Sequence, residues 1–217
     1  MVTALDEDRR LALTYASVSV REALGALWAL DAALAAALGG GREPMIARIK
    51  LAWWRDALEA LDTRPPPPQP ELQAAAGLVE KGLSGAKLGA LAEGWALLAD
   101  PAQLDEATLQ AFADQRGAQL FWLAATLIGD NRLPPGAGAA WALADLARHS
   151  SKREEAAMAL KLAGRRTPDA RWPARLRPLG MLDALARRDA ARGLDRLEPP
   201  GTPARMLRMM RHRLTGR

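Results

Sequence analysis

The sequence predicts an all-α protein that forms a single helical bundle. Alanine and leucine dominate the 217 residues, and both favour helices. Valine, isoleucine and threonine, which favour strands, are scarce. Nearly half of the residues are hydrophobic, which is enough to bury a core in a domain of this length. Because no strand pattern and no repeat of fixed period competes, we expect residues 1–217 to form one domain.

The first half of the chain predicts long helices. Apolar residues recur at helical spacing over residues 6–38, which indicates two helices, and the glycines at 39–41 end the run. The next helix begins near Glu43 and Pro44, because proline is tolerated at the first helical position. Its wide apolar stripe predicts that this helix is largely buried. The proline-rich segment 64–70 is interpreted as a stiff surface loop.

The second half of the chain continues the helical pattern. Glycine and proline separate its helices, since both residues break a helix. Ser150 and Ser151 are expected to cap one of these helices. The helices are expected within residues 71–98, 105–128, 138–149, 152–162, 172–197 and 204–214.

Charge is unevenly distributed along the chain. Residues 1–147 carry 12 basic and 18 acidic side chains, a net charge of −6, whereas residues 148–217 carry 18 basic and 7 acidic side chains, a net charge of +11. This asymmetry suggests an anionic partner, either a membrane surface, an acidic protein or a nucleic acid. The competing interpretation is a solvated helix face with internal ion pairs.

The basic terminal helix at 204–214 is the candidate surface for an anionic partner. A short basic amphipathic helix can lie on anionic lipid. Nucleic acid is the weaker interpretation, because no nucleic-acid-binding fold is recognised and the helix contains no aromatic residue. The basic residues of this candidate surface are Arg205, Arg208, Arg211 and Arg213.

Several kinds of chemistry are excluded by composition. The absence of cysteine excludes disulfides, thiolate catalysis and zinc–thiolate sites. Only His149 and His212 are available, too few for a histidine metal site or a nucleophilic triad.

The acidic start has no apolar signal region, and uncharged runs such as 117–129 are too short to span a bilayer. We expect a cytoplasmic protein, with peripheral attachment to the inner membrane as an option.

The segment from Glu43 to Leu58 resembles a signature of the squalene/phytoene synthase family. A glutamate–proline–methionine start and a tryptophan–tryptophan–arginine centre carry the likeness, and weaker likenesses at residues 8–30, 140–148 and 172–217 follow in the same order. The resemblance implies an isoprenoid-synthase fold and prenyl diphosphate chemistry. The matching signature residues are Glu43, Pro44, Trp53, Trp54, Arg55 and Asp56.

The chain departs from that family at its acidic motifs. In active members, two aspartate-rich motifs on facing helices bind Mg²⁺, which holds the diphosphate and helps the substrate to ionise. In this chain no two carboxylates lie four residues apart. Asp31 stands alone before the positions near Ala35 and Ala36 where the first pair would align. The second motif is replaced by the neutral and basic residues 149–153.

One acidic ladder with spacing of three residues remains, at Asp56, Glu59 and Asp62. We interpret it as a solvated helix face on which Arg55 pairs with Glu59, rather than as a cation site.

These observations favour a catalytically degenerate family member without catalytic, metal or cofactor residues. Such a protein would bind an isoprenoid lipid or a protein partner as a scaffold, and the family includes an assembly factor of respiratory complex I. The first alternative is an active Mg²⁺-dependent prenyltransferase in which Arg148 and Arg153 contact the diphosphate. The second alternative is a basic module that binds a membrane surface or a nucleic acid.

Overall fold

The computed structural model describes residues 5–39, 43–100, 102, 104–166 and 170–217. Every regular element in these ranges is helical and no strand is present in them, which confirms the all-α prediction. The helices are α1 Glu7–Thr14, α2 Val18–Gly39, α3 Pro44–Glu59, η1 Ala60–Asp62, α4 Pro70–Glu80, α5 Gly85–Ala96, α6 Glu106–Phe112, η3 Ala113–Ala118, α7 Gln119–Ile128, α8 Ala139–His149, α9 Arg153–Arg165, η4 Ala174–Leu176, α10 Arg177–Arg192, η5 Leu194–Arg196 and α11 Pro203–Thr215.

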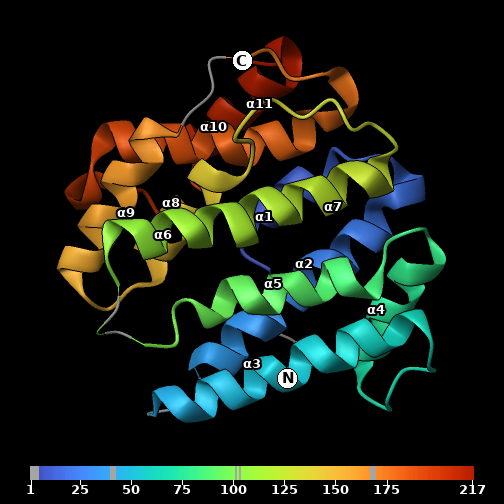
Figure 1. The fold of residues 1–217 in the computed structure, drawn as a ribbon. Helices are drawn as coiled ribbons and strands as arrows, with labels where there is room; N and C mark the ends of the chain where they lie inside the picture. The colour runs from blue at the N-terminus through green and yellow to red at the C-terminus, as the bar shows by residue number, and fades with distance from the viewer. Residues whose placement is uncertain (1–4, 40–42, 101, 103, 167–169) are drawn as a thin grey trace.

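The helices form two halves on either side of one long rod (Figure 1). The rod consists of α6, η3 and α7, which follow one another without a break. In one half, α2 contacts α3, α4 and α5, and in the other half, α10 contacts α8, α9 and α11. Because η3 contacts α5 on one side and α8 on the other, the centre of the rod connects the two halves.

Aromatic side chains join the two halves in the core. Trp28 of α2 lies edge-on to Trp141 of α8, with ring centroids 5.2 Å apart, and also contacts Phe121 of α7 at 6.2 Å. Phe121 in turn contacts Trp172 at 6.3 Å. Edge-to-face pairs at these separations add to the stabilisation that burial of the rings provides.

The helix α2 is long and apolar enough to cross a membrane by length and composition. The helix is not an uncharged run, because it contains Arg21, Glu22 and Asp31, so the search for uncharged runs did not find it. Packing explains its composition, because Leu24 and Trp28 are each 1% exposed in the core. It ends at Gly39, and the neighbouring glycines 40 and 41 lie outside the described residues.

The prediction that the helix after Pro44 is largely buried is wrong. Only Ala47, Leu51 and Leu58 of α3 are buried. The apolar stripe is wider than the surface that neighbouring helices cover, and helical spacing cannot reveal which part of a stripe a neighbour covers. Large hydrophobic side chains that remain exposed on α3 are those of Met45, Ile46, Ile49 and Trp53.

Two smaller expectations also change. The proline-rich loop ends at Gln69, because Pro70 is already the first residue of α4. Neither Ser150 nor Ser151 caps α9, whose N-cap is Lys152 without a side-chain hydrogen bond. The Ser150 hydroxyl instead donates to the Lys152 carbonyl oxygen at 3.3 Å.

Candidate functional site

The long helix expected at 105–128 contains a π-helical segment, η3, at its centre. Such segments are rare and often occur at functional sites. Glycines allow the neighbouring backbones to approach it closely. A Cβ atom on Gly94 of α5 would lie 2.9 Å from the Arg116 backbone nitrogen, and one on Gly117 would lie 2.4 Å from the Gly138 carbonyl oxygen. This packing fixes Arg116 of η3 between the two halves.

The guanidinium of Arg116 bridges carboxylates on two different helices. Its Nε and Nη2 donate to the two oxygens of Asp31 on α2, at 3.0 and 2.8 Å. Its Nη2 also donates to Asp145 Oδ2 on α8, at 2.7 Å. Arg116 is 1% exposed and Asp31 is fully buried. The cation therefore lies between the two helices that carry these carboxylates.

Tryptophan rings hold this bridge in place. The Arg116 guanidinium carbon lies 4.1 Å from the ring centroid of Trp95 and 4.7 Å from that of Trp141. The indole N–H of Trp95 donates to Asp31 Oδ1 at 2.9 Å. Cation–π contacts are stronger for a desolvated cation, and Arg116 is 1% exposed.

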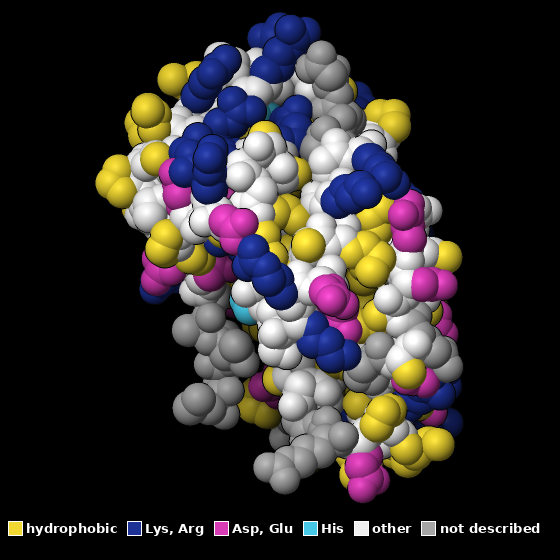
Figure 2. Space-filling model, turned by 90° about the vertical axis from the view of Figure 1, so that its left-hand side faces the viewer, with side chains coloured by type: hydrophobic (Ala, Val, Ile, Leu, Met, Phe, Trp, Pro, Cys, Tyr) yellow, Lys and Arg dark blue, Asp and Glu magenta, His cyan; other side chains and the backbone are white. Residues whose placement is uncertain are grey.

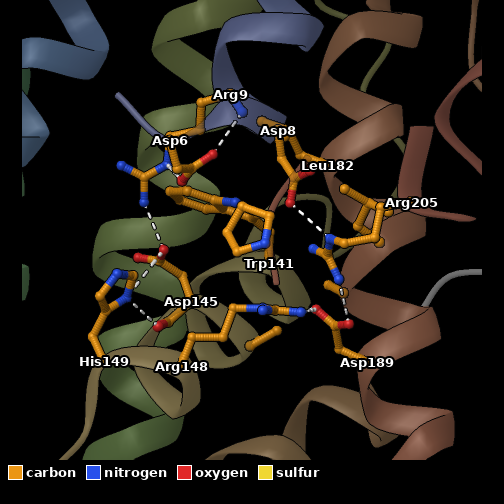
Figure 3. Close-up of a pocket in the computed structure, with 14 residues that line it drawn as sticks. Asp6, Asp8, Arg9, Trp141, Asp145, Arg148, His149, Leu182, Asp189 and Arg205 are labelled. Carbon is orange, nitrogen blue, oxygen red and sulfur yellow. Dashed lines mark hydrogen bonds and ion pairs between the residues drawn. The ribbon is translucent and has the colours of Figure 1, made fainter. Parts of the chain in front are cut away.

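A second arginine completes the buried ion network. Arg9 Nη2 of α1 donates to Asp145 Oδ1 at 2.6 Å, and Arg9 Nε lies 3.2 Å from Asp6 Oδ2 (Figure 3). His149 lies at the end of α8. Its Nδ1 atom is 3.6 Å from the Asp145 carboxylate and 2.8 Å from the Asp145 backbone carbonyl oxygen. Both carboxylate oxygens of Asp145 are thus engaged by arginines.

The network fixes the charge of its members. Burial alone would raise the pKa of Asp145, but Arg9 and Arg116 outweigh burial and hold that pKa well below its usual range. Burial alone would lower the pKa of Arg116, but Asp31 and Asp145 outweigh it and raise that pKa. These groups therefore stay ionised at neutral pH.

A second ion network ties the C-terminal helix to the rest of the bundle (Figure 3). Arg205 of α11 donates to Asp8 Oδ2 at 2.8 Å and to Asp189 Oδ1 at 2.6 Å. Arg148 of α8 donates to Asp189 Oδ2 at 2.7 Å and to the Glu198 carbonyl oxygen at 2.8 Å. Asp8 is adjacent in sequence to Arg9, so α1 contributes to both networks.

A cavity of about 440 Å³ lies over the first network. Its polar wall contains three carboxylates and two guanidinium groups, which sum to −1 with His149 neutral. The Nη1 atom of Arg116 is buried and has no hydrogen-bond partner among the described residues. The polar residues are Asp6, Arg9, Asp31, Arg116, Asp145 and His149, and the apolar wall includes Ala32, Ala35, Ala36 and Leu38.

The residues of this cavity do not fit Mg²⁺. That ion requires several oxygen ligands in a near-octahedral arrangement. The carboxylate oxygens of Asp31 and Asp145 already accept hydrogen bonds from Arg116, Arg9 and Trp95. Among the described residues, no group of three or more His, Asp or Glu side chains has an arrangement that could hold a metal ion. Alanines line the wall at 35 and 36, where the family's paired aspartates were aligned.

The signature residues lie apart from this cavity. Glu43 precedes α3 and Pro44 begins it, while Trp53 to Asp56 occupy its second half, and none of them lines the cavity. Arg55 donates to Asp56 Oδ1 at 2.7 Å and lies 4.0 Å from Glu59, so the expected pair is present. Asp62 has a structural role, since it accepts the Gly85 backbone N–H at 2.6 Å at the start of α5.

The two arginines considered for diphosphate binding are separated. Arg148 is engaged by Asp189, whereas Arg153 lies on the surface and pairs with Asp195 at 2.5 Å. A smaller pocket of about 180 Å³ is lined by Arg148 and not by Arg153.

The assignment of Arg205 to a basic surface is wrong. This residue is 3% exposed, because it forms the buried pairs with Asp8 and Asp189. Arg211 is exposed, and Arg208 and Arg213 are partly buried. Lys and Arg side chains do gather over the end of the molecule that contains α10 and α11 (Figure 2).

Sequence reasoning missed the Arg116 bridge. One signal was present, since Arg116 is the only basic residue between Lys87 and Arg132. A lone arginine within an apolar stretch calls for an acidic partner, because buried charges are rarely left unpaired. The partners could not be named, because they lie 85 and 29 residues away in sequence.

Asp183 is a buried carboxylate outside both networks. It is fully buried in α10, and burial raises its pKa to about 6, with Arg187 opposing the shift. The folded state therefore holds this proton more tightly than the unfolded state, so the stabilisation from protonation is lost as the pH rises through about 6. Asparagine cannot ionise, so the Asp183→Asn variant should not show this loss. We expect its free energy of unfolding, relative to that of the parent, to rise by about 3 kcal/mol as the pH increases from about 4 to about 7.

Urea unfolding across this pH range measures the difference between the Asp183→Asn variant and the parent. The matched control is Asp195→Asn, because the Asp195 side chain is 75% exposed and should give no pH-dependent gain. A difference for Asp183→Asn that does not change with pH would contradict the assignment.

Comparison with known proteins identifies one family. The family model described as squalene/phytoene synthase matches residues 2–160, which is 159 of the 217 residues. The all-α architecture agrees with the isoprenoid-synthase fold. No curated protein matches the chain, and no solved structure matches it.

Proposed function

We propose that this chain, which belongs to the squalene/phytoene synthase family, is a catalytically degenerate member that binds an apolar ligand instead of transferring prenyl groups. The position of Arg116 between Asp31 and Asp145 supports this proposal most directly. A guanidinium in a bidentate contact satisfies carboxylate oxygens that a metal ion would otherwise need. A bound metal ion would keep coordination positions free for the oxygens of a diphosphate. The Arg116 guanidinium, already engaged by two carboxylates, cannot replace the metal in this role.

The chemistry of the cavity favours a ligand with a neutral polar head. Its ionised side chains sum to −1, which opposes a multiply charged diphosphate in the absence of a metal. The His149 side chain, which lines the cavity and is 69% exposed, can form a hydrogen bond with a hydroxyl or carbonyl oxygen. The alanines of α2 provide an apolar wall for a hydrocarbon chain. An isoprenoid alcohol or ketone meets all three requirements.

In this proposal the protein acts by binding and not by turnover. The ligand-filled bundle would serve as a scaffold for a protein partner, as in the branch of the family that assembles a respiratory complex. The buried ion networks around Arg116 and Arg205 suit such a role. Paired buried charges can fix one arrangement of the helices, and a scaffold needs a surface of constant shape.

Titration of the protein with farnesol tests the proposal. We expect saturable quenching of tryptophan fluorescence without added Mg²⁺, because Trp95 lines the cavity. Ala35→Phe should abolish this quenching, since a phenyl ring at that position fills the cavity beside α2.

The matched control is Val18→Phe, which adds the same side chain to the same helix at a position that is 80% exposed. That variant should bind farnesol as the parent does. Release of pyrophosphate from farnesyl diphosphate in the presence of Mg²⁺, or farnesol quenching that Ala35→Phe leaves intact, would overturn the proposal.

A further inference from the structure

A stripe of large hydrophobic side chains is exposed on α3 between Met45 and Trp53. Met45 is 63% exposed, Ile46 42%, Ile49 62% and Trp53 45%. Ile49 lies three or four residues from each of the other three, so the four side chains share one face of the helix. Single exposed hydrophobic residues are common, but four in nine residues on one face form a continuous patch that indicates an interaction surface. We call this patch the α3 stripe.

The fold does not need the α3 stripe. The opposite side of α3, with Ala47, Leu51 and Leu58, is the buried side. There α5 approaches closely, because a Cβ atom on Gly85 would lie only 2.2 Å from the Leu58 carbonyl oxygen. The helix is therefore firmly seated through one side, while the other side presents its hydrophobic residues to the surroundings.

Basic residues flank the α3 stripe on both sides. At about 100° per residue, the stripe covers a sector of about 100°, with Arg48 beyond one edge and Lys50 beyond the other. Both side chains are exposed, and Arg48 also lies 3.5 Å from the carboxylate of Asp100. Residues 44–55 contain three basic residues and no acidic one, within a half of the chain that is acidic overall. The first acidic residue on this side of the helix is Asp56, which is paired with Arg55.

We propose that the α3 stripe docks the protein on an anionic bilayer surface, with α3 lying parallel to the membrane. Hydrophobic residues at the centre and cations at both edges match the hydrocarbon boundary and the anionic headgroups of such a surface. Trp53 adds a residue type that concentrates at this boundary.

The position of α3 also suits delivery of an apolar ligand. Leu38 and Gly39, at the end of α2, line the central cavity, and α3 begins five residues after Gly39. The docking surface itself stands on the exposure and charge of α3 and does not depend on a ligand in the cavity.

Co-sedimentation of the full chain with vesicles tests this inference. We expect binding to vesicles of phosphatidylcholine mixed with phosphatidylglycerol, weaker binding to phosphatidylcholine alone, and loss of binding at high salt. Ile49→Asp should lower the partition coefficient by about tenfold or more, since it removes an inserted hydrophobic side chain and adds a negative charge. Its melting temperature should equal that of the parent, because Ile49 is largely exposed.

The matched control is Leu207→Asp, at a residue of α11 that is 68% exposed. This variant should bind as the parent does. If Leu207→Asp abolishes binding while Ile49→Asp retains it, the terminal helix is the membrane surface and the inference is wrong. The inference also fails if the parent is a dimer without vesicles and Ile49→Asp makes it a monomer, because the stripe then joins two copies. The vesicles contain no isoprenoid, so neither outcome bears on the farnesol titration.

Discussion

Replacement of Arg116 by methionine is expected to lower the free energy of unfolding by about 3–5 kcal/mol, because it leaves buried carboxylates without their cation. Asp31 would keep only the hydrogen bond from Trp95, and Asp145 would keep Arg9. Methionine retains much of the volume between the two tryptophans, so loss of packing contributes little. Urea unfolding at neutral pH measures the change.

Two comparisons isolate the role of charge at Arg116. Arg165→Met removes the exposed pair with Glu106, in which both side chains are about half exposed, and should cost less than about 1 kcal/mol. The double variant Asp31→Leu and Arg116→Met should recover stability relative to Arg116→Met, since it removes the unpaired carboxylate of Asp31 while Asp145 keeps its pair with Arg9. An Arg116→Met variant as stable as Arg165→Met would show that the bridge contributes little.

The second large effect is expected at Arg205. Arg205→Met should lower the free energy of unfolding by about 3 kcal/mol, because Asp8 and Asp189 are both buried and both accept hydrogen bonds from its guanidinium. The loss should be smaller than for Arg116, since Asp189 keeps Arg148 and Asp8 keeps the backbone N–H of Gly201. Thermal and urea unfolding both report this change.

Arg211→Met is the matched control on the same helix. Arg211 is exposed, so its replacement should change stability by less than about 0.5 kcal/mol. Equal stability of the two variants would mean that α11 is held by its apolar contacts alone and that the Arg205 pairs are incidental.

The sequence predicts most helices of this fold because local signals mark their ends. Gly39 ends α2, and Pro44 and Pro203 begin α3 and α11. These signals act through the conformation of single residues and need no knowledge of tertiary contacts. The all-α class and the family resemblance followed from the same local information.

The candidate site depends on contacts that no local pattern contains. Arg205 was expected on the surface because it alternates with apolar residues, yet its partner Asp8 lies 197 residues away. Arg116 lies in η3, a π-helical segment that no local pattern predicted, and its partner Asp31 lies 85 residues away. The exposure of α3 was missed for a related reason, since a stripe records which residues share a face and not whether another helix covers them.

A thermal-shift titration with farnesyl diphosphate, with and without Mg²⁺, tests the central claim most directly. With Arg116 between Asp31 and Asp145, we expect no stabilisation by the diphosphate beyond what Mg²⁺ alone produces. A rise in melting temperature that requires the diphosphate and Mg²⁺ together would contradict the claim, because it would mean that a metal-dependent diphosphate site survives in this cavity.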